Sequence, residues 1–264
     1  MAISIKSEED LAKMRVAGRL AADVLDFIGE YVKAGVTTEY LDDLCAEYIK
    51  SRDCISACLG YGHPPYPKHT CISVNHVICH GIPDDKKLKN GDILNIDVTV
   101  IKDEFHGDSS RMYVVGEPSI SAKRLIDTTY QAMWLGIKEV KPGATLADIG
   151  RAIQNFAEAE RFSVVRDFCG HGIGRGFHEE PQVLHYYRKG AEEIVLKEGM
   201  TFTIEPMINA GKYQMKILQN GWTAVTRDRS LSAQWEHMLA VTATGYEIFT
   251  LSAAEREQGI NPCG

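Results

Sequence analysis

Apolar and polar positions follow two periods along this chain, one typical of helices and one typical of strands. Apolar residues recur every three or four positions behind hydroxyl or acidic start signals, which is the pattern of an amphipathic helix with a capped amino end. Elsewhere apolar and polar residues alternate, which is the pattern of a half-buried strand. The first period predicts helices from Ser7 to the Lys33-Ala34-Gly35 stop, from Thr37 or Thr38 to Ile49, from Ser121 to Val140, and from Thr145 to Phe156. The second predicts strands over residues 94–100, 200–205 and 230–241.

The same order of elements occurs twice. Residues 32–37 (VKAGVT) match residues 140–145 (VKPGAT), and each match lies between two predicted helices. The offset between these segments also carries Asp97 onto Glu205. We therefore expect an α/β (α+β) fold in which two related helix-helix-strand halves, about residues 4–115 and 116–251, form a single domain over residues 1–264. Antiparallel strands from both halves would line one cleft, and helices would cover their outer face.

Two carboxylates lie at the centre of the first half. Asp97 belongs to the polar face of strand 94–100, together with Asn95 and Thr99. A two-residue turn at 102–103 would place Asp108 directly opposite Asp97, where Cβ atoms are about 4.5 to 5.5 Å apart and like charges repel. The pair is therefore either solvated on an exposed hairpin or bridged by a cation.

Further ligand-type residues follow in the second half. His171 lies in a glycine-rich run, Glu205 ends a strand before a proline, and Glu236 precedes His237. Strand parity favours Glu236 as the ligand and His237 as a packed residue. Four carboxylates and one imidazole carry four negative charges, which balance two divalent cations.

The glycine-rich run 168–181 does not suit a phosphate. A phosphate loop needs a helix after its glycines, and Glu179-Glu180-Pro181 is a poor helix start. The glycines instead allow the backbone to approach a ligand closely while presenting His171 and His178. The alternative is that both histidines are hydrogen-bonded core residues.

Composition and charge exclude several classes of protein. The formal net charge is −7 and the basic residues are scattered, which argues against a specific nucleic-acid partner. No signal-peptide pattern opens the chain and no apolar window is long enough for a membrane span, so we expect a cytoplasmic protein without a membrane partner. Seven cysteines without a C-x-x-C pair favour reduced thiols.

Five segments together resemble the ligand segments of the type I (bacterial) methionine aminopeptidases, in the creatinase/aminopeptidase superfamily. They are Asn95-Ile96-Asp97-Val98, His106-Gly107-Asp108-Ser109-Ser110, Gly170-His171-Gly172-Ile173-Gly174, Thr203-Ile204-Glu205-Pro206 and Gln234-Trp235-Glu236-His237. The resemblance implies the pita-bread fold and removal of the initiator methionine from nascent polypeptides, at the ribosome, when the second residue is small. It also implies two divalent ions (Co, Mn, Fe or Zn) and a monomer.

The resemblance assigns roles residue by residue. It implies that Asp97, Asp108, His171, Glu205 and Glu236 bind the metals, and that His80, His178 and Glu205 are catalytic. It implies a substrate pocket formed by Cys58, Tyr61, Tyr66, Cys71, His80, Phe177, His178 and Trp222. The Gly62–Tyr66 loop is longer than the usual bacterial pattern, and the tail after Leu251 has no matching segment.

Two other functions compete with this one. A proline-directed peptidase, such as aminopeptidase P or prolidase, shares the fold and the five ligands, but usually carries an additional amino-terminal domain. A non-catalytic peptide-binding relative would have lost its metals, which is at odds with five intact ligand positions.

Overall fold

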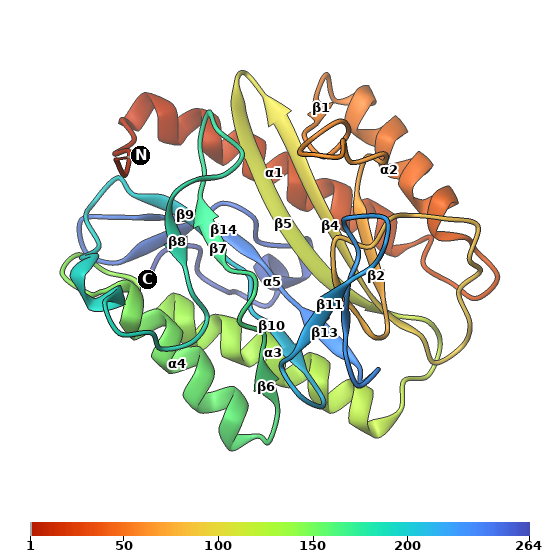
Figure 1. The fold of residues 1–264 in the computed structure, drawn as a ribbon. Coiled ribbons are helices and arrows are strands. Elements are labelled where there is room, and N and C mark those ends of the chain that lie inside the picture. Colours follow the sequence, from red (N-terminus) through yellow and green to blue (C-terminus); the bar gives the residue numbers. More distant parts are fainter. Residues whose placement is uncertain (1) are drawn as a thin grey trace.

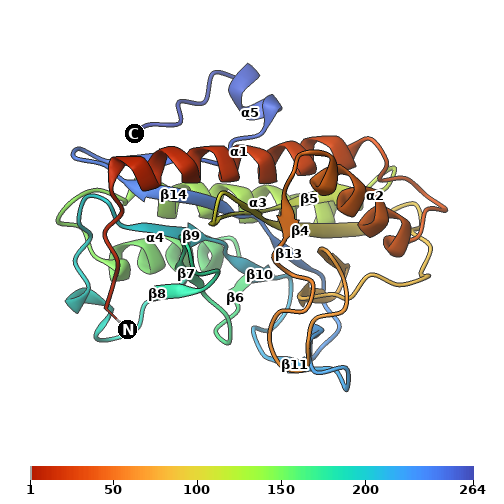
Figure 2. The ribbon, with the colours of Figure 1, turned by 90° about the horizontal axis from the view of Figure 1, so that it is seen from above.

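The protein is layered, with helices on one face of its antiparallel sheets and long loops on the other (Figures 1 and 2). A computed structural model describes residues 2–264. Helices α1 and α3 lie on one side of the strands, and α5 lies outside α1 (Figure 2). The segments around β6, β8 and β11 lie on the opposite side (Figure 2). Within residues 2–264, no helix is both long and apolar enough to cross a membrane.

The helices and strands have the following bounds. The helices are α1 (Glu8–Gly29), α2 (Thr38–Ser51), α3 (Ile120–Lys138), α4 (Leu146–Ala159), α5 (Ala253–Glu257) and the 3-10 turn η1 (Ala191–Glu193). The strands of the first half are β1 (Ile55–Ser56), β2 (Cys71–Val74), β3 (Val77–Cys79), β4 (Ile93–Lys102) and β5 (Phe105–Val114). Those that follow are β6 (Ser163–Val164), β7 (Gly170–Gly172), β8 (Glu179–Val183), β9 (Thr201–Ile204), β10 (Met207–Asn209), β11 (Met215–Ile217), β12 (Ala224–Thr226), β13 (Ser232–Gln234), β14 (His237–Val241) and β15 (Tyr246–Ile248).

The predicted starts of α1, α2 and α4 are confirmed, whereas α3 begins at Ile120 behind the cap Ser119, just before the predicted Ser121. Ser7 caps α1 by accepting the N–H of Asp10, Thr37 caps α2, and the Asp148 carboxylate accepts the N–H and the hydroxyl of Thr145 at the start of α4. The end of α1 is earlier than expected. The chain leaves the helix after Gly29 and runs through turns to Gly35, which has a φ of 88°.

The β4–β5 hairpin has a different register from the predicted one. Its turn is Asp103-Glu104, both with positive φ (49° and 71°), which matches the twist that two-residue hairpin turns require. Asp97 therefore faces Ser110, and Asp108 faces Thr99. The prediction that Asp97 and Asp108 are direct cross-strand partners was wrong. The two carboxylates share one face of the hairpin and lie on a diagonal.

The two halves each contribute a main sheet, and β3 of the first half joins β12 and β11 of the second in a further small sheet. In the first, β5 lies along one edge of β4, and β1 and β2 pair with β4. In the second, the strand order is β15-β14-β9-β7-β8. The predicted strand over 230–241 is broken, because β13 pairs with β10 whereas β14 pairs with β9. At the break, the N–H of Glu236 donates to the carbonyl of Ser110 (3.1 Å) and joins the two halves.

Each half has its own hydrophobic core between helices and strands. The first packs α1 and α2 against β4, and the second packs α3 and α4 against the strands of the second half. Fully buried members include Leu25, Ile28, Leu41, Ile96 and Val98 in the first, and Leu125, Ile137, Ile149, Phe202 and Ile204 in the second. These are the apolar stripes predicted from the helical and strand periods.

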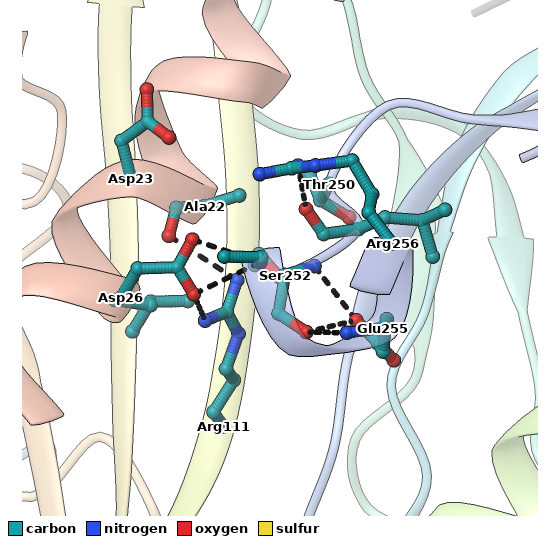
Figure 3. A network of polar contacts seen from close by, with 12 residues as sticks. Ala22, Asp23, Asp26, Arg111, Thr250, Ser252, Glu255 and Arg256 are labelled. Carbon is teal, nitrogen blue, oxygen red and sulfur yellow. Dashed lines mark hydrogen bonds and ion pairs between the residues drawn. The ribbon is translucent and has the colours of Figure 1, made fainter. Parts of the chain in front are cut away.

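The carboxyl-terminal helix α5 is tied to the rest of the fold by polar contacts (Figure 3). Asp26 of α1 accepts hydrogen bonds from Arg111 of β5 and from the N–H of Ala253. Glu255 forms a capping box with Ser252 at the start of α5. Glu255 also contacts Tyr130 and His237, so the tail is bonded to both halves.

Candidate metal centre and substrate pocket

A cavity of about 350 Å³ lies where the two sheets meet. It is lined by every residue that the sequence assigned to the site, from both halves of the chain. These are Cys58, Tyr61, Tyr66, Cys71, His80, Asp97, Asp108, His171, Phe177, His178, Glu205, Trp222 and Glu236. The cavity thus combines an acidic end with an apolar end.

The two aspartates enter the cavity from the β4–β5 hairpin. Asp108 is 2% exposed, and its Oδ1 accepts a hydrogen bond from Thr99, its cross-strand partner (2.8 Å). Asp97 lies on the same face of the neighbouring strand. Because one oxygen of Asp108 is held by Thr99, the other oxygen is free to face the cavity.

His171 on β7 meets the acids through its Nε2 atom. This atom lies 3.5 Å from Asp108 Oδ2 and 3.6 Å from Glu205 Oε1. Nδ1 lies 3.0 Å from the carbonyl of Gly172, so Nδ1–H donates there and Nε2 is left to face the carboxylates. Asp108, His171 and Glu236 each offer one ligand atom within 4.8 Å of the others.

Glu205 is held on three sides at the end of β9. Thr203 donates to Oε1 (2.8 Å) and Gln234 donates to Oε2 (3.1 Å). The backbone N–H of Glu205 donates to Nε2 of His185, which is fully buried (3.1 Å). These contacts fix both the carboxylate and the strand end that carries it.

Glu236 and His237 point to opposite sides of the chain, as their parity predicts. Glu236 is 2% exposed and lines the cavity. His237 is a packed residue whose Nδ1 lies 2.9 Å from Thr250 Oγ1 and whose Nε2 lies 3.1 Å from Glu255 Oε1. The strand break at Glu236 therefore places a carboxylate in the cavity and an imidazole in the core.

The electrostatics of the acidic end fit a cation. Burial, followed by the charge of Asp108, raises the pKa values of Asp97 and Glu236 well above the usual range. Burial also raises the pKa of Glu205 to about 7. Four carboxylates crowded out of water repel one another, whereas divalent cations would neutralise them. The donor set of oxygens with one imidazole suits Mn, Fe or Co as well as Zn.

The other end of the cavity is apolar and uncharged. Cys58, Tyr66 and Cys71 form a buried cluster against which Phe177 and Trp222 pack. The rings of Tyr66 and Trp222 meet edge to face, with centroids 5.2 Å apart. This end has the composition of a pocket for an apolar, polarizable side chain.

Two further histidines, His80 and His178, line the cavity but do not belong to the acidic cluster. Burial, with the nearby His171, lowers the pKa of His178 to about 4, and burial lowers that of His80 to about 4. His178 Nδ1 lies 2.6 Å from the Tyr61 hydroxyl. Both imidazoles are neutral at pH 7, and with Tyr61 as the donor the Nε2–H of His178 is free to donate.

Several lining residues were not predicted. Cys79, Asp167, Phe168, Cys169, Met207 and Gln234 also line the cavity. Gln234 lies on the same side of the predicted strand as Glu236, and residues 167–169 lie at the start of the glycine-rich run, so a local signal existed for both. His185 behind Glu205 has no such signal, because Glu205, whose backbone N–H it accepts, lies 20 positions away in the sequence.

The profile of Metallopeptidase family M24 matches residues 12–243. A methionine aminopeptidase of Salmonella typhimurium (strain LT2) is 62% identical over 253 residues, which cover 95% of each chain. The crystal structure of methionine aminopeptidase from Rickettsia prowazekii has a TM-score of 0.92 and 58% identity, and the match covers 95% of this chain and 100% of that chain. The prolidase from Pyrococcus furiosus shares only the fold, with a TM-score of 0.74 and 22% identity over 94% of this chain and 65% of that chain. The predicted pita-bread fold is thus confirmed, and the chain belongs to metallopeptidase family M24 and, within it, to the methionine aminopeptidases.

Proposed function

We propose that this protein removes the amino-terminal methionine from polypeptides whose second residue is small, including the initiator methionine of nascent chains. One observation carries the proposal: a single cavity joins five ligand-type side chains to an uncharged pocket of thiols and aromatic rings. We place this activity in the cytoplasm, at the ribosome, and assign it to a monomer whose single domain spans both halves of the chain.

Asp97, Asp108, His171, Glu205 and Glu236 would hold two divalent ions. Their four negative charges balance the four positive charges of two such ions, which would offset the burial and the charge of Asp108 that raise the pKa values of Asp97 and Glu236. When bound, divalent ions supply Lewis-acid charge that polarises the scissile carbonyl and makes water a usable nucleophile at neutral pH.

The chain's own residues would orient the substrate and move its protons. Nε2–H of His178 would donate to the carbonyl oxygen as negative charge develops on it, because Nδ1 is already engaged by Tyr61. Glu205 would take a proton from the attacking water and deliver it to the departing amine. Thr203 and Gln234 keep the Glu205 carboxylate in one orientation. His80, whose ring meets that of Trp222 edge to face, would bind the peptide.

Specificity would come from the apolar end of the cavity. A thioether gains about 0.3 to 1.5 kcal/mol from each sulfur-aromatic contact, in addition to burial. A Lys or Asp side chain would leave an unpaired charge among Cys58, Tyr66 and Phe177, which is far more costly. Methionine is therefore the side chain that these surroundings favour.

Release of free amino acid from Met-Ala-Ser and from Ala-Pro-Ser tests the proposal. We expect Met to be released from the first peptide and nothing from the second, and we expect Phe177→Ala to lower the turnover of Met-Ala-Ser. Lys138→Met on the outer helix α3 is the control. Release from Ala-Pro-Ser alone would instead assign a proline-directed activity, and full turnover of Met-Ala-Ser by Phe177→Ala would place the methionine side chain elsewhere.

A further inference from the structure

The amino-terminal segment reaches the loop side of the molecule and contacts the glycine-rich run. From the start of α1 it passes to the side of the sheet on which β8 lies (Figure 2). There the N–H of Lys6 donates to the carbonyl of Gly199 (2.8 Å), and Lys6 Nζ lies 2.6 Å from Glu179 Oε2. The Lys6 side chain is only 8% exposed. A lysine this buried is tolerated because its charge is paired.

Glu179 is the centre of this group of contacts. Its Oε2 accepts from Lys6 and from the hydroxyl of Ser4 (2.9 Å), and its Oε1 accepts from the backbone N–H of Gly176 (2.8 Å). Glu179 is also the first residue of β8 and pairs with Gly172 at the end of β7. Glu179 therefore links the amino-terminal segment to the loop 173–178 in two ways. Its side chain reaches Gly176 inside the loop, and its backbone pairs with Gly172 at the base of the loop.

Two glycines of the run make room for this ion pair. A Cβ atom on Gly174 would lie 2.5 Å from Lys6 Cε and 2.6 Å from its Nζ. A Cβ atom on Gly176 would lie 3.0 Å from Glu179 Cγ. At these two positions the lysine and the glutamate occupy the space that a glycine leaves open, so both side chains pack directly against the run.

The loop that the pair holds carries two residues of the cavity, Phe177 and His178. Their rings stack on one another with centroids 4.3 Å apart, and Phe177 also stacks on His106 (5.5 Å). The N–H of His106 donates to the carbonyl of Gly174 (2.9 Å). β5 thus supports the loop through His106, and Lys6 and Glu179 support it through Gly176 and the packing at Gly174.

We propose that Lys6 and Glu179 are positioning residues, which hold the loop 173–178 so that His178 faces the scissile carbonyl and Phe177 closes the methionine pocket. The role of His178 in this inference rests on the proposed function, whereas the ion pair itself does not. Ordinary exposed ion pairs contribute little. The pair of Lys6 and Glu179 is largely withdrawn from water, and its carboxylate also accepts a backbone amide of the loop. Its loss should therefore loosen the loop 173–178.

The test compares Lys6→Met, which keeps the length of the side chain but loses the charge, with the rescue variant Lys6→Arg. The control is Lys123→Met, which breaks an exposed ion pair with Asp127 on α3. Turnover of Met-Ala-Ser, metal content and thermal unfolding are measured for each variant. We expect Lys6→Met to lower kcat by roughly 10- to 100-fold, the scale of a small misplacement of a catalytic group, with metal content unchanged. Lys6→Arg should recover most of the rate, and Lys123→Met should equal the wild type.

Lys6→Met in a His178→Ala background distinguishes the positioning of His178 from a general loss of stability. If Lys6 acts through His178, Lys6→Met should change kcat less than about twofold once that imidazole is gone, because the two effects are not additive. An equal fall in kcat in both backgrounds would overturn the inference that Lys6 positions His178. If Lys6→Met does not fold, Glu179→Gln, which keeps an acceptor for the Gly176 amide, takes its place.

Hydrogen exchange of the amides of residues 174–178 provides a readout independent of the reaction. We expect faster exchange in Lys6→Met and Glu179→Gln than in the wild type and Lys123→Met. Unchanged exchange in both variants would overturn the inference. If the wild type released no methionine while exchange still responded to Lys6, the proposed function would fail and the positioning of the loop by the ion pair would stand.

Discussion

His171 and His178 lie side by side, with ring centroids 4.1 Å apart, yet their surroundings give them different tasks. His171 Nε2 faces two carboxylates, whereas His178 is bonded to a tyrosine hydroxyl. We predict that His171→Ala loses bound metal. We predict that His178→Ala keeps its metal and lowers kcat by roughly 10² to 10³ fold, the usual effect of removing one donor to a developing oxyanion.

Metal analysis and Met-Ala-Ser turnover of the purified variants check this division of roles. Tyr61→Phe is a useful intermediate, because it removes the hydroxyl that holds His178 and leaves His171 untouched. Equal metal contents in His171→Ala and His178→Ala would contradict the assignment.

Single residues were predictable from the sequence where a local pattern marks them. Asp97, Glu205 and Glu236 stand out because strand alternation places each on a polar face, and the structure brings them together. His185 and Lys6 could not be found in this way. Their importance comes from contacts with Glu205 and Glu179, which are remote in sequence.

Strand boundaries and register were less predictable than the strands themselves. The alternation over residues 94–100 identifies β4, but the register of its hairpin depends on two turn residues, Asp103 and Glu104, that adopt positive φ without being glycine or asparagine. Likewise, the alternation of residues 230–241 does not show that β13 and β14 pair with different strands. Tertiary pairing decides both features.

Helix α5 contributes stability through a buried acid, and its effect should depend on pH. Burial raises the pKa of Glu255, but the charge of His237 and hydrogen bonds from His237, Ser252 and Tyr130 outweigh it and hold that pKa well below its usual range. A lowered pKa in the folded state stabilises the fold above the unfolded value of about 4.3, and this contribution disappears as pH falls through the folded value.

We therefore predict that Glu255→Gln lowers the free energy of unfolding by about 2 to 3 kcal/mol at pH 7, the scale of hydrogen bonds to a charged group. The difference should be intact at pH 5 and shrink below about pH 4. Urea unfolding of both proteins across this range measures it, with Glu257→Gln on the exposed side of the same helix as the control. A difference that stays constant down to pH 3.5 would contradict this account of α5.

At the level of the whole molecule, the active cavity is the junction of two halves that each have their own core. The repeated helix-helix-strand order predicted this arrangement, and the cavity draws on strands from both halves. The halves are also joined directly, by the pairing of β3 with β12, by a shared apolar cluster that includes Phe105 and Met238, and by the hydrogen bond between Ser110 and Glu236. Ions bound between Asp97 and Asp108 on one side and Glu205 and Glu236 on the other would add to these links.

We predict that chelation lowers the thermal midpoint of the intact protein. A ligand present at 100 times its Kd stabilises the folded state by about 2.7 kcal/mol, which corresponds to about 5 to 10 °C for a chain of this size. Thermal unfolding with and without added Mn²⁺ measures the shift. Asp108→Asn, which removes one ligand charge, should show a smaller shift, and an equal shift in that variant would argue against Asp108 as a ligand.

The proposed function requires that metal held by these five side chains drives the release of methionine. The most direct measurement is the rate of Met release from Met-Ala-Ser by exhaustively chelated protein, into which Mn²⁺, Co²⁺ or Fe²⁺ is then titrated. We expect no release before the titration and a rate that rises with added metal until the sites are filled. Full activity in the chelated protein, or no activity at any metal concentration, would contradict the account.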